Sequence, residues 1–172
     1  MIYTPAIPFS AVLAVIILTI AMPGLSFATE YAIRKKLSKN NIYLSSVISI
    51  FVCVYLLTQM YSTKIVLDEK QIELSSLSFS NSVQLTDVSK AEIYDNGLPA
   101  EYQADWRING IGLFGYLVGK FTTLSGDKIY MQSTQPPYIV LTMNNNNPAI
   151  VMSADNNFYA SLQKKLTPPP NK

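Results

Sequence analysis

The chain has 172 residues, of which 49% are hydrophobic and 14% are charged, and its formal net charge is +2. One cysteine and no histidine exclude an intrachain disulfide and argue against a metal centre with Cys and His ligands. Lysine and arginine form no basic cluster after Tyr61, which argues against a nucleic-acid partner. Globular proteins have about 25% charged residues, so the composition indicates a partly membrane-embedded protein.

The charged residues are unevenly distributed along the chain. Residues 1–61 contain five of them, all between two long apolar segments: Glu30, Arg34, Lys35, Lys36 and Lys39. The chain is therefore expected to have three parts. They are an apolar part (residues 1–61), a water-soluble domain (residues 62–166) and a proline-rich, disordered tail (residues 167–172).

The first apolar segment extends from Ala6 to Ala28 and predicts a transmembrane helix over about residues 8–28. About 20 apolar residues span the hydrocarbon core of a bilayer. Pro23 and Gly24 are expected to kink or end this helix near one interface. A cleaved signal peptide is the alternative, because Ser26-Phe27-Ala28 resembles a cleavage site, but the segment lacks the positive N-terminal region of signal peptides.

The second apolar segment, Ile42–Tyr61, is also uncharged and long enough to span a bilayer, which takes about 20 residues. Its tyrosines suit the aromatic belts at membrane interfaces or contacts between helices. The alternative is a core helix of a soluble protein, which the length and the absence of charge disfavour. Cys53 lies within this segment and is expected to be an inert apolar thiol.

The two segments are expected to pack together as a helix hairpin with the lipid bilayer around it. Small residues recur four positions apart, which lets helices approach closely: Ser10 and Ala14, and Ser45 and Ser49.

The loop between the helices, residues 29–41, determines the expected orientation. It contains four basic residues, Arg34, Lys35, Lys36 and Lys39, and positive residues in short loops stay in the cytoplasm. We therefore expect the N-terminus and the soluble domain on the opposite side. In a bacterium, this places the domain on the outer face of the cytoplasmic membrane.

The soluble domain is expected to be mostly β-structure. Alternating and β-branched stretches predict strands, and stretches rich in Gly, Asn or Pro predict turns. The expected strands are Thr63–Asp68, Gln71–Phe79, Val83–Leu85, Val88–Tyr94, Leu113–Thr123, Lys128–Ser133, Tyr138–Met143 and Ala149–Met152. Short strands with short turns are typical of a small barrel or sandwich.

The last part of the domain has a helical period. Phe158, Leu162 and Leu166 recur at helical spacing and predict an amphipathic helix that covers one side of the β-structure. We expect Ser153 or Asp155 to cap the start of this helix.

Four of the seven glycines lie within ten residues: Gly110, Gly112, Gly115 and Gly119. A phosphate-binding loop requires a strand before the glycines and a helix after them. The residues that follow here favour a strand, so we expect no nucleotide cofactor. Glycine within β-structure marks bulges, bends or close backbone approach, and Trp106 and Arg107 are expected to brace such a bend.

This glycine pattern resembles a motif of a bacterial pleckstrin-homology-like family of membrane proteins. The motif residues, with the adjacent Trp106, are Arg107, Asn109, Gly110, Gly112, Gly115, Tyr116, Gly119 and Phe121. The resemblance covers about residues 63–166. It implies a PH-like small β-barrel or sandwich capped by one C-terminal helix, and it implies no catalytic residue. The basic phosphoinositide-binding loop of eukaryotic relatives has no counterpart in this chain.

We therefore expect a non-catalytic, membrane-anchored interaction module that binds a protein, peptide or envelope ligand, such as another membrane protein. An accessory subunit that acts through its transmembrane helices is the alternative. Catalysis is disfavoured, because without histidine it would depend on scattered carboxylates. The carboxylates considered are Asp87, Glu92, Asp95, Glu101, Asp105 and Asp127.

Overall fold

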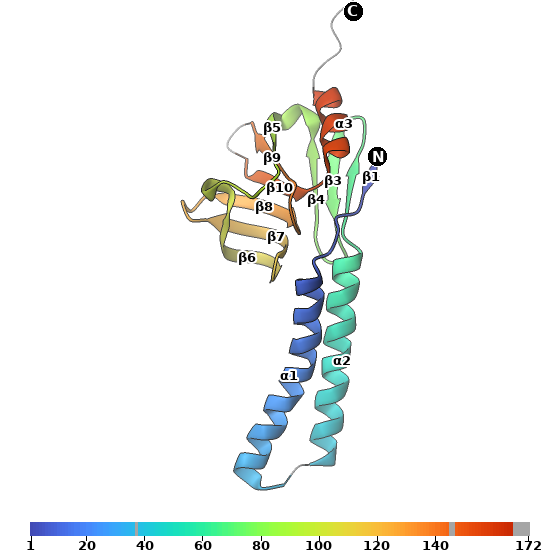
Figure 1. Ribbon diagram of the computed structural model, residues 1–172, viewed down its shortest axis with the longest axis vertical. Helices are drawn as coiled ribbons and strands as arrows, with labels where there is room; N and C mark the ends of the chain where they lie inside the picture. Colours follow the sequence, from blue (N-terminus) through green and yellow to red (C-terminus); the bar gives the residue numbers. More distant parts are fainter. Residues whose placement is uncertain (37, 145–146, 167–172) are drawn as a thin grey trace, which may run out of the picture.

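Two long helices form a hairpin that carries a β domain at one end (Figure 1). The computed structural model describes residues 1–36, 38–144 and 147–166, so the expected tail lies outside the described residues. The helices are α1 (Phe9–Arg34) and α2 (Lys39–Tyr61). The loop that joins them lies at the end remote from the β domain, and the segment before α1 returns to that domain.

Helix α1 continues through Pro23 and Gly24 to Arg34, so the expected end near Ala28 is wrong. A proline removes one backbone hydrogen bond, but the bonds on either side of it persist. The helix ends at Lys35, whose backbone is left-handed (φ 55°) and whose N–H donates to the carbonyl of Tyr31.

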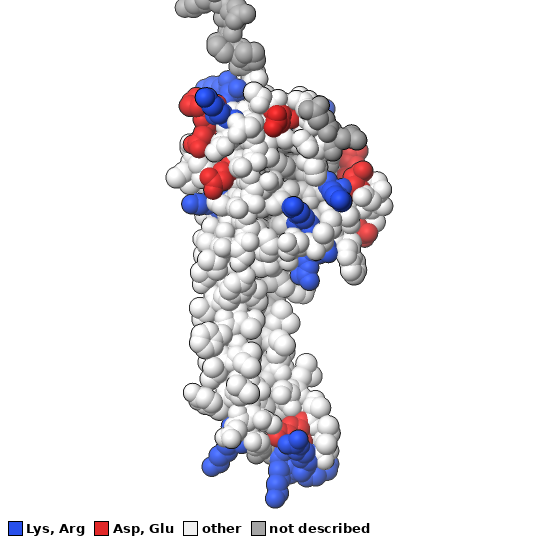
Figure 2. Space-filling view, turned by 180° about the vertical axis from the view of Figure 1, so that it is seen from behind, with Lys and Arg blue, Asp and Glu red and all other residues white. Residues whose placement is uncertain are grey.

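Both helices are candidate membrane-spanning segments by length and composition. Only 17% of the most apolar stretch of α1 and 6% of that of α2 are buried, whereas the core helix of a soluble protein would be mostly covered. Figure 2 shows an uncharged belt along the hairpin, with charged side chains at the loop end and on the β domain. The two helices therefore present apolar side chains to their surroundings over most of their length.

The first sheet contains four antiparallel strands in the order β1-β2-β3-β4. They are β1 (Ile2–Tyr3), β2 (Lys64–Leu67), β3 (Gln71–Ser75) and β4 (Ser80–Gln84). The sequence did not predict β1, which precedes α1 and pairs with the strand that follows α2. Because β1 and β2 belong to one sheet, both ends of the helix hairpin are fixed in the same domain.

The second sheet contains six strands in the order β5-β9-β10-β8-β7-β6. They are β5 (Val88–Tyr94), β6 (Ala104–Leu113), β7 (Tyr116–Thr123), β8 (Lys128–Ser133), β9 (Tyr138–Met143) and β10 (Ala149–Ser153). Strands β8 and β10 are parallel, and the other neighbours are antiparallel. The domain thus consists of one antiparallel sheet, one mixed sheet and one C-terminal helix.

Two of the expected strands are interrupted by turns, so their predicted bounds are wrong. Residues 76–79 connect β3 to β4, and Phe114 and Gly115 connect β6 to β7. Both residues of the second turn have positive φ, 33° for Phe114 and 90° for Gly115. Two such residues in succession form the tight turn that matches the twist of a hairpin.

Helix α3 (Asn156–Leu166) packs on the β domain as its period predicts. Phe158 and Leu162 are fully buried. The Asp155 carboxylate accepts a hydrogen bond of 2.8 Å from the N–H of Phe158, which confirms an N-cap at this position.

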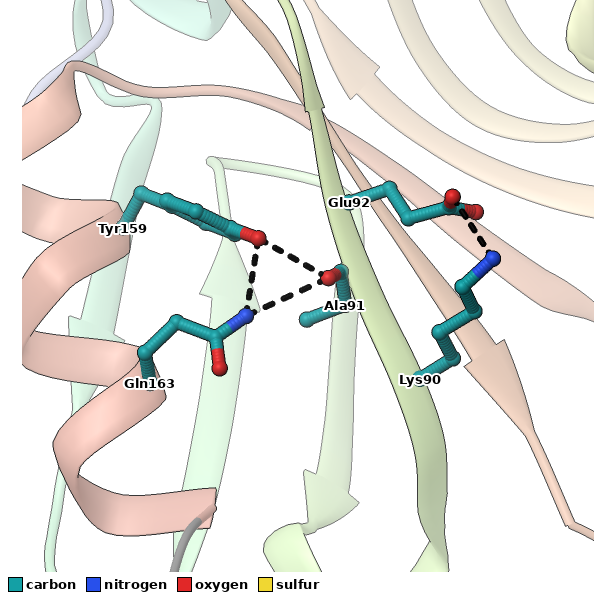
Figure 3. Close-up of polar contacts among 5 residues, drawn as sticks. All are labelled: Lys90, Ala91, Glu92, Tyr159 and Gln163. Atoms are coloured by element: carbon teal, nitrogen blue, oxygen red, sulfur yellow. Dashed lines mark hydrogen bonds and ion pairs between the residues drawn. The ribbon is translucent and has the colours of Figure 1, made fainter.

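Two polar side chains of α3 also hold it to strand β5. Tyr159 and Gln163 both donate to the carbonyl of Ala91, at 3.0 and 3.2 Å (Figure 3). The Lys90–Glu92 ion pair lies on the other side of that strand. The carbonyl of Ala91 is therefore bonded to the helix, while the charged pair stays away from it.

The β domain is bonded directly to the end of α2. The Gln59 side chain donates to Ser76 Oγ at 2.6 Å and accepts from the N–H of Ser78 at 2.8 Å. The Tyr116 hydroxyl lies 2.8 Å from Thr63 Oγ1. An apolar cluster joins both helices to β7: Ala11, Val15, Met60, Tyr116 and Val118. These contacts fix the direction in which the domain faces relative to the helix axes.

Candidate functional site

A cleft with a volume of about 540 Å³ opens between the two sheets. Edge strand β4 forms one wall, and strands β6, β7 and β8 form the opposite wall. The residues that line it include Asn81, Ser82, Ile108, Lys120, Lys128 and Tyr130. The cleft combines apolar and polar groups in one concavity of the domain, and we treat it as the candidate binding site.

The register of β7 and β8 explains why polar residues line this wall. Lys120 pairs with Tyr130, and Thr122 pairs with Lys128. Directly paired residues point to the same face of a sheet, and residues two apart along a strand share that face. All four side chains therefore lie on the face that turns toward β4, with the two lysines on neighbouring strands.

The bulge in β6 contributes an apolar group to the same wall. The pairing of β6 with β7 shifts between Arg107 and Asn109, which leaves Ile108 without a directly paired residue. A bulge re-aims the side chain of the extra residue. Ile108 lines the cleft as a result.

The Tyr130 hydroxyl is a buried donor without a hydrogen-bond partner among the described residues. Tyr130 is 5% exposed. Four buried side-chain polar atoms lack a hydrogen-bond partner in the described part of the chain, and among their residues only Tyr130 lines the cleft. A buried polar group without a partner costs about 1–3 kcal/mol.

The two lysines give the cleft a positive wall. Lys120 and Lys128 are exposed, and neither forms an ion pair with another described residue. Asp87 lies at the cleft as well. The arrangement can therefore accept an anionic group near the lysines.

Burial raises the pKa of Tyr130 to about 12, with a smaller contribution from Tyr116. The neutral phenol is thus favoured in the folded state. The contribution of this group to folding stability is fully present below pH 10 and is lost as the pH rises toward 12. We expect Tyr130→Phe to remove this part of the alkaline destabilisation, up to about 3 kcal/mol at two pKa units. Chemical unfolding of wild type and variant at pH values across this range measures the difference. If the unfolding free energy of the variant falls with alkaline pH as steeply as that of wild type, Tyr130 is not a source of the alkaline destabilisation.

The motif glycines have structural positions. Gly110 and Gly119 face each other across β6 and β7, and a Cβ at Gly119 would lie 2.3 Å from the carbonyl oxygen of Asn109 and 2.5 Å from the Cα of Gly110. Close backbone approach, one of the three structural explanations considered, explains this pair. Gly115 is the second of the two residues with positive φ in the β6–β7 turn. Gly112 faces Leu117, and a Cβ on this glycine would lie 3.3 Å from the leucine side chain.

The other motif residues divide into buried and exposed ones. Tyr116 and Phe121 are buried, on opposite faces of β7. Trp106, Arg107 and Asn109 are exposed on β6. Trp106 has 72% of its surface exposed, so the expected bracing of a bend by Trp106 and Arg107 is wrong.

The carboxylates considered as catalytic candidates lie in different surroundings. Asp87 lies at the cleft, Glu101 and Asp127 line a second, more open depression, and Glu92 pairs with Lys90 at 2.7 Å. The remaining two are exposed: Asp95 and Asp105. No group of three His, Cys, Asp or Glu residues that could hold a metal ion occurs within the described residues.

The basic residues of the helix loop lie far from the cleft. Arg34, Lys35, Lys36 and Lys39 end α1, follow it or begin α2, at the end of the hairpin remote from the β domain (Figure 2). Arg34 approaches Glu30 at 4.0 Å.

The sequence did not single out Lys120, Lys128 or Tyr130. The signal available in the sequence was that polar residues alternate within two neighbouring strands. Lys120 and Thr122 are two residues apart, and so are Lys128 and Tyr130. Which face turns toward β4 depends on long-range pairing.

No protein-family model matches the chain, and neither does any curated protein or solved structure. The candidate site is therefore defined by its geometry.

Proposed function

We propose that the protein is a membrane-anchored, non-catalytic binding module. Its two helices span the membrane, and its PH-like β domain binds an extended segment of another membrane or envelope protein in the cleft between the sheets. The observation that carries the proposal is the fixed attachment of a domain with an open, partly cationic cleft to a helix pair with apolar outer faces. A rigid attachment holds the cleft at a constant height above the bilayer.

The free edge of β4 supports an extended peptide as the ligand. Two backbone bonds bracket the β3–β4 ladder: the N–H of Ser76 donates to Phe79, and the N–H of Leu85 donates to Lys70. Bonded pairs recur every second residue in an antiparallel ladder, so the backbone of Ser82 points away from β3. Added strands pair with such free edges.

The charge of the cleft indicates an acidic group on this peptide. An extended segment paired with Ser82 would pass the wall that contains Lys120 and Lys128. A carboxylate there gains charge-assisted hydrogen bonds.

Photo-crosslinking in the native membrane tests the binding function. A photoreactive amino acid at Ile108 is expected to give discrete adducts that disappear in the double variant Lys120→Glu/Lys128→Glu. The matched variant Lys70→Glu/Lys164→Glu has the same change in charge outside the cleft and is expected to keep the adducts. Equal adducts from a photoreactive residue at Leu124, or no effect of the cleft lysines, would contradict the proposal.

We propose that the β domain lies outside the cytoplasmic membrane of a bacterium, because the four basic residues occupy the opposite end of the hairpin. In a Cys53→Ser background, a membrane-impermeant maleimide is expected to label Leu124→Cys in intact cells and Lys36→Cys only after lysis. Labelling of Lys36→Cys in intact cells would show that the orientation is the reverse of the proposed one.

A further inference from the structure

Two loops of the β domain contact the helices at the level of their apolar spans. The β6–β7 turn is the first. Ser10 Oγ, in the first turn of α1, donates a hydrogen bond of 3.1 Å to the carbonyl of Phe114. Gly115 lies beside Pro8, since a Cβ built on it would be 3.7 Å from the proline ring. This turn therefore lies at the same level as the start of α1.

The β3–β4 loop, residues 76–79, is the second. The Ser78 hydroxyl lies 2.6 Å from the Tyr55 hydroxyl. Tyr55 precedes the end of α2 at Tyr61 by six residues, which is about 9 Å along a helix. The loop therefore reaches past the end of α2 and lies alongside the last turns of this helix.

The length of α1 places both contacts at a membrane surface. The charged residue nearest the apolar span at the loop end is Glu30. A hydrocarbon core of about 30 Å takes about 20 residues, and counting back from Glu30 reaches Ser10. Tyr55 lies inside the apolar segment Ile42–Tyr61. Groups bonded to Ser10 and Tyr55 are therefore close to the boundary between headgroups and acyl chains.

Each loop carries a large apolar side chain that the protein does not cover. Phe114 is 72% exposed and Leu77 is 52% exposed. Single exposed apolar residues are common on any protein surface. Leu124, in the turn between β7 and β8, is 71% exposed and is an example at the opposite end of β7. What distinguishes Leu77 and Phe114 is their position beside the apolar helices.

We propose that the loops β3–β4 and β6–β7 are immersed in the membrane interface, with Leu77 and Phe114 inserted among the lipids. This inference rests on the proposed membrane-spanning role of the helices. Apolar and aromatic side chains gain free energy at this depth. Two inserted points on different sheets, together with the helix pair, would prevent the domain from tilting and would hold the cleft in a fixed orientation.

Tryptophan fluorescence in bilayers with brominated lipids tests the proposal. Trp106 is the single tryptophan of the chain. The substitution Trp106→Phe removes it, so that each reporter is the only tryptophan in its variant. The full chain then receives one reporter at a time: Leu77→Trp, Phe114→Trp, Leu124→Trp or Ile20→Trp. Ile20 is an exposed residue in the middle part of α1. Circular dichroism in the same bilayers verifies that each variant is folded.

We expect lipids brominated near the headgroup to quench the reporters at Leu77 and Phe114 several-fold more than the reporter at Leu124. We expect the reporter at Ile20 to be quenched best by bromine near the end of the acyl chain. If Ile20 is quenched while Leu77 and Phe114 resemble Leu124, the interface proposal is wrong and the membrane-spanning helices stand. If only one loop is quenched, the two-point immersion is wrong. If Ile20 itself is not quenched, the proposed membrane anchoring fails.

Discussion

Gly119→Ala is expected to destabilise the β domain by about 3 kcal/mol or more, which is a large part of the roughly 5–15 kcal/mol that stabilises a typical domain. The residue has φ of +123°, and an added methyl group would lie 2.3 Å from the Asn109 carbonyl oxygen and 2.5 Å from the Gly110 Cα. Backbone strain of about 1–2 kcal/mol and overpacking of about 1–3 kcal/mol add. Thermal unfolding of the detergent-solubilised chain measures the loss, expected as a decrease in Tm of more than about 10 °C.

Gly126→Ala is the matched control for this prediction. Gly126 also has positive φ, +88°, but nothing lies within 4 Å of the position of its Cβ. Strain alone then applies, and we expect a loss of about 1 kcal/mol. Equal losses at the two positions would show that the close approach of β6 and β7 at Gly110 and Gly119 does not limit the stability of the domain.

The features that the sequence predicted correctly depend on local patterns. The two long helices follow from apolar composition, and α3 follows from the spacing of Phe158 and Leu162, both of which are buried. The capping by Asp155 is likewise a contact over three residues. Such patterns are visible in a single sequence because helical contacts are between near neighbours.

The features that the sequence did not predict depend on long-range pairing or on strained backbone. Strand β1 pairs with β2 across both helices, and β10 inserts between β8 and β9. Phe114 adopts φ of 33°, which a large side chain rarely does, so the turn resembled a strand. The cleft was missed for the same reason, because Lys120 and Tyr130 meet only through the register of β7 and β8.

The exposed residues of β6 show where a motif misleads. Trp106 and Arg107 stand next to the glycines in the sequence, and bracing of the bend was a reasonable expectation. The glycines instead bring two backbones together, which needs no brace, and Trp106 stays exposed. An aromatic residue beside a glycine cluster can therefore be a surface residue, and burial has to be established from the strand pairing.

Phe158→Ala is expected to destabilise the domain by about 3–5 kcal/mol, the usual cost of removing a buried phenylalanine side chain. Phe158 is fully buried in the core that contains residues of both sheets, and its ring centroid is 5.8 Å from that of Tyr3 on β1. The loss would weaken the contact of α3 with the strand that leads into α1. Thermal unfolding measures the effect, and limited proteolysis is expected to cut α3 earlier in the variant.

Tyr159→Phe separates this packing effect from the polar contacts of the same helix. The substitution removes the hydroxyl that donates to the Ala91 carbonyl and accepts from Gln163, but the carbonyl keeps the 3.2 Å bond from Gln163. We expect a loss of about 1 kcal/mol, well below that of Phe158→Ala. A larger loss for Tyr159→Phe would mean that hydrogen bonds to β5, and not the buried ring, hold α3 on the β domain. The apolar stripe would then guide the helix to its place without supplying most of its stability.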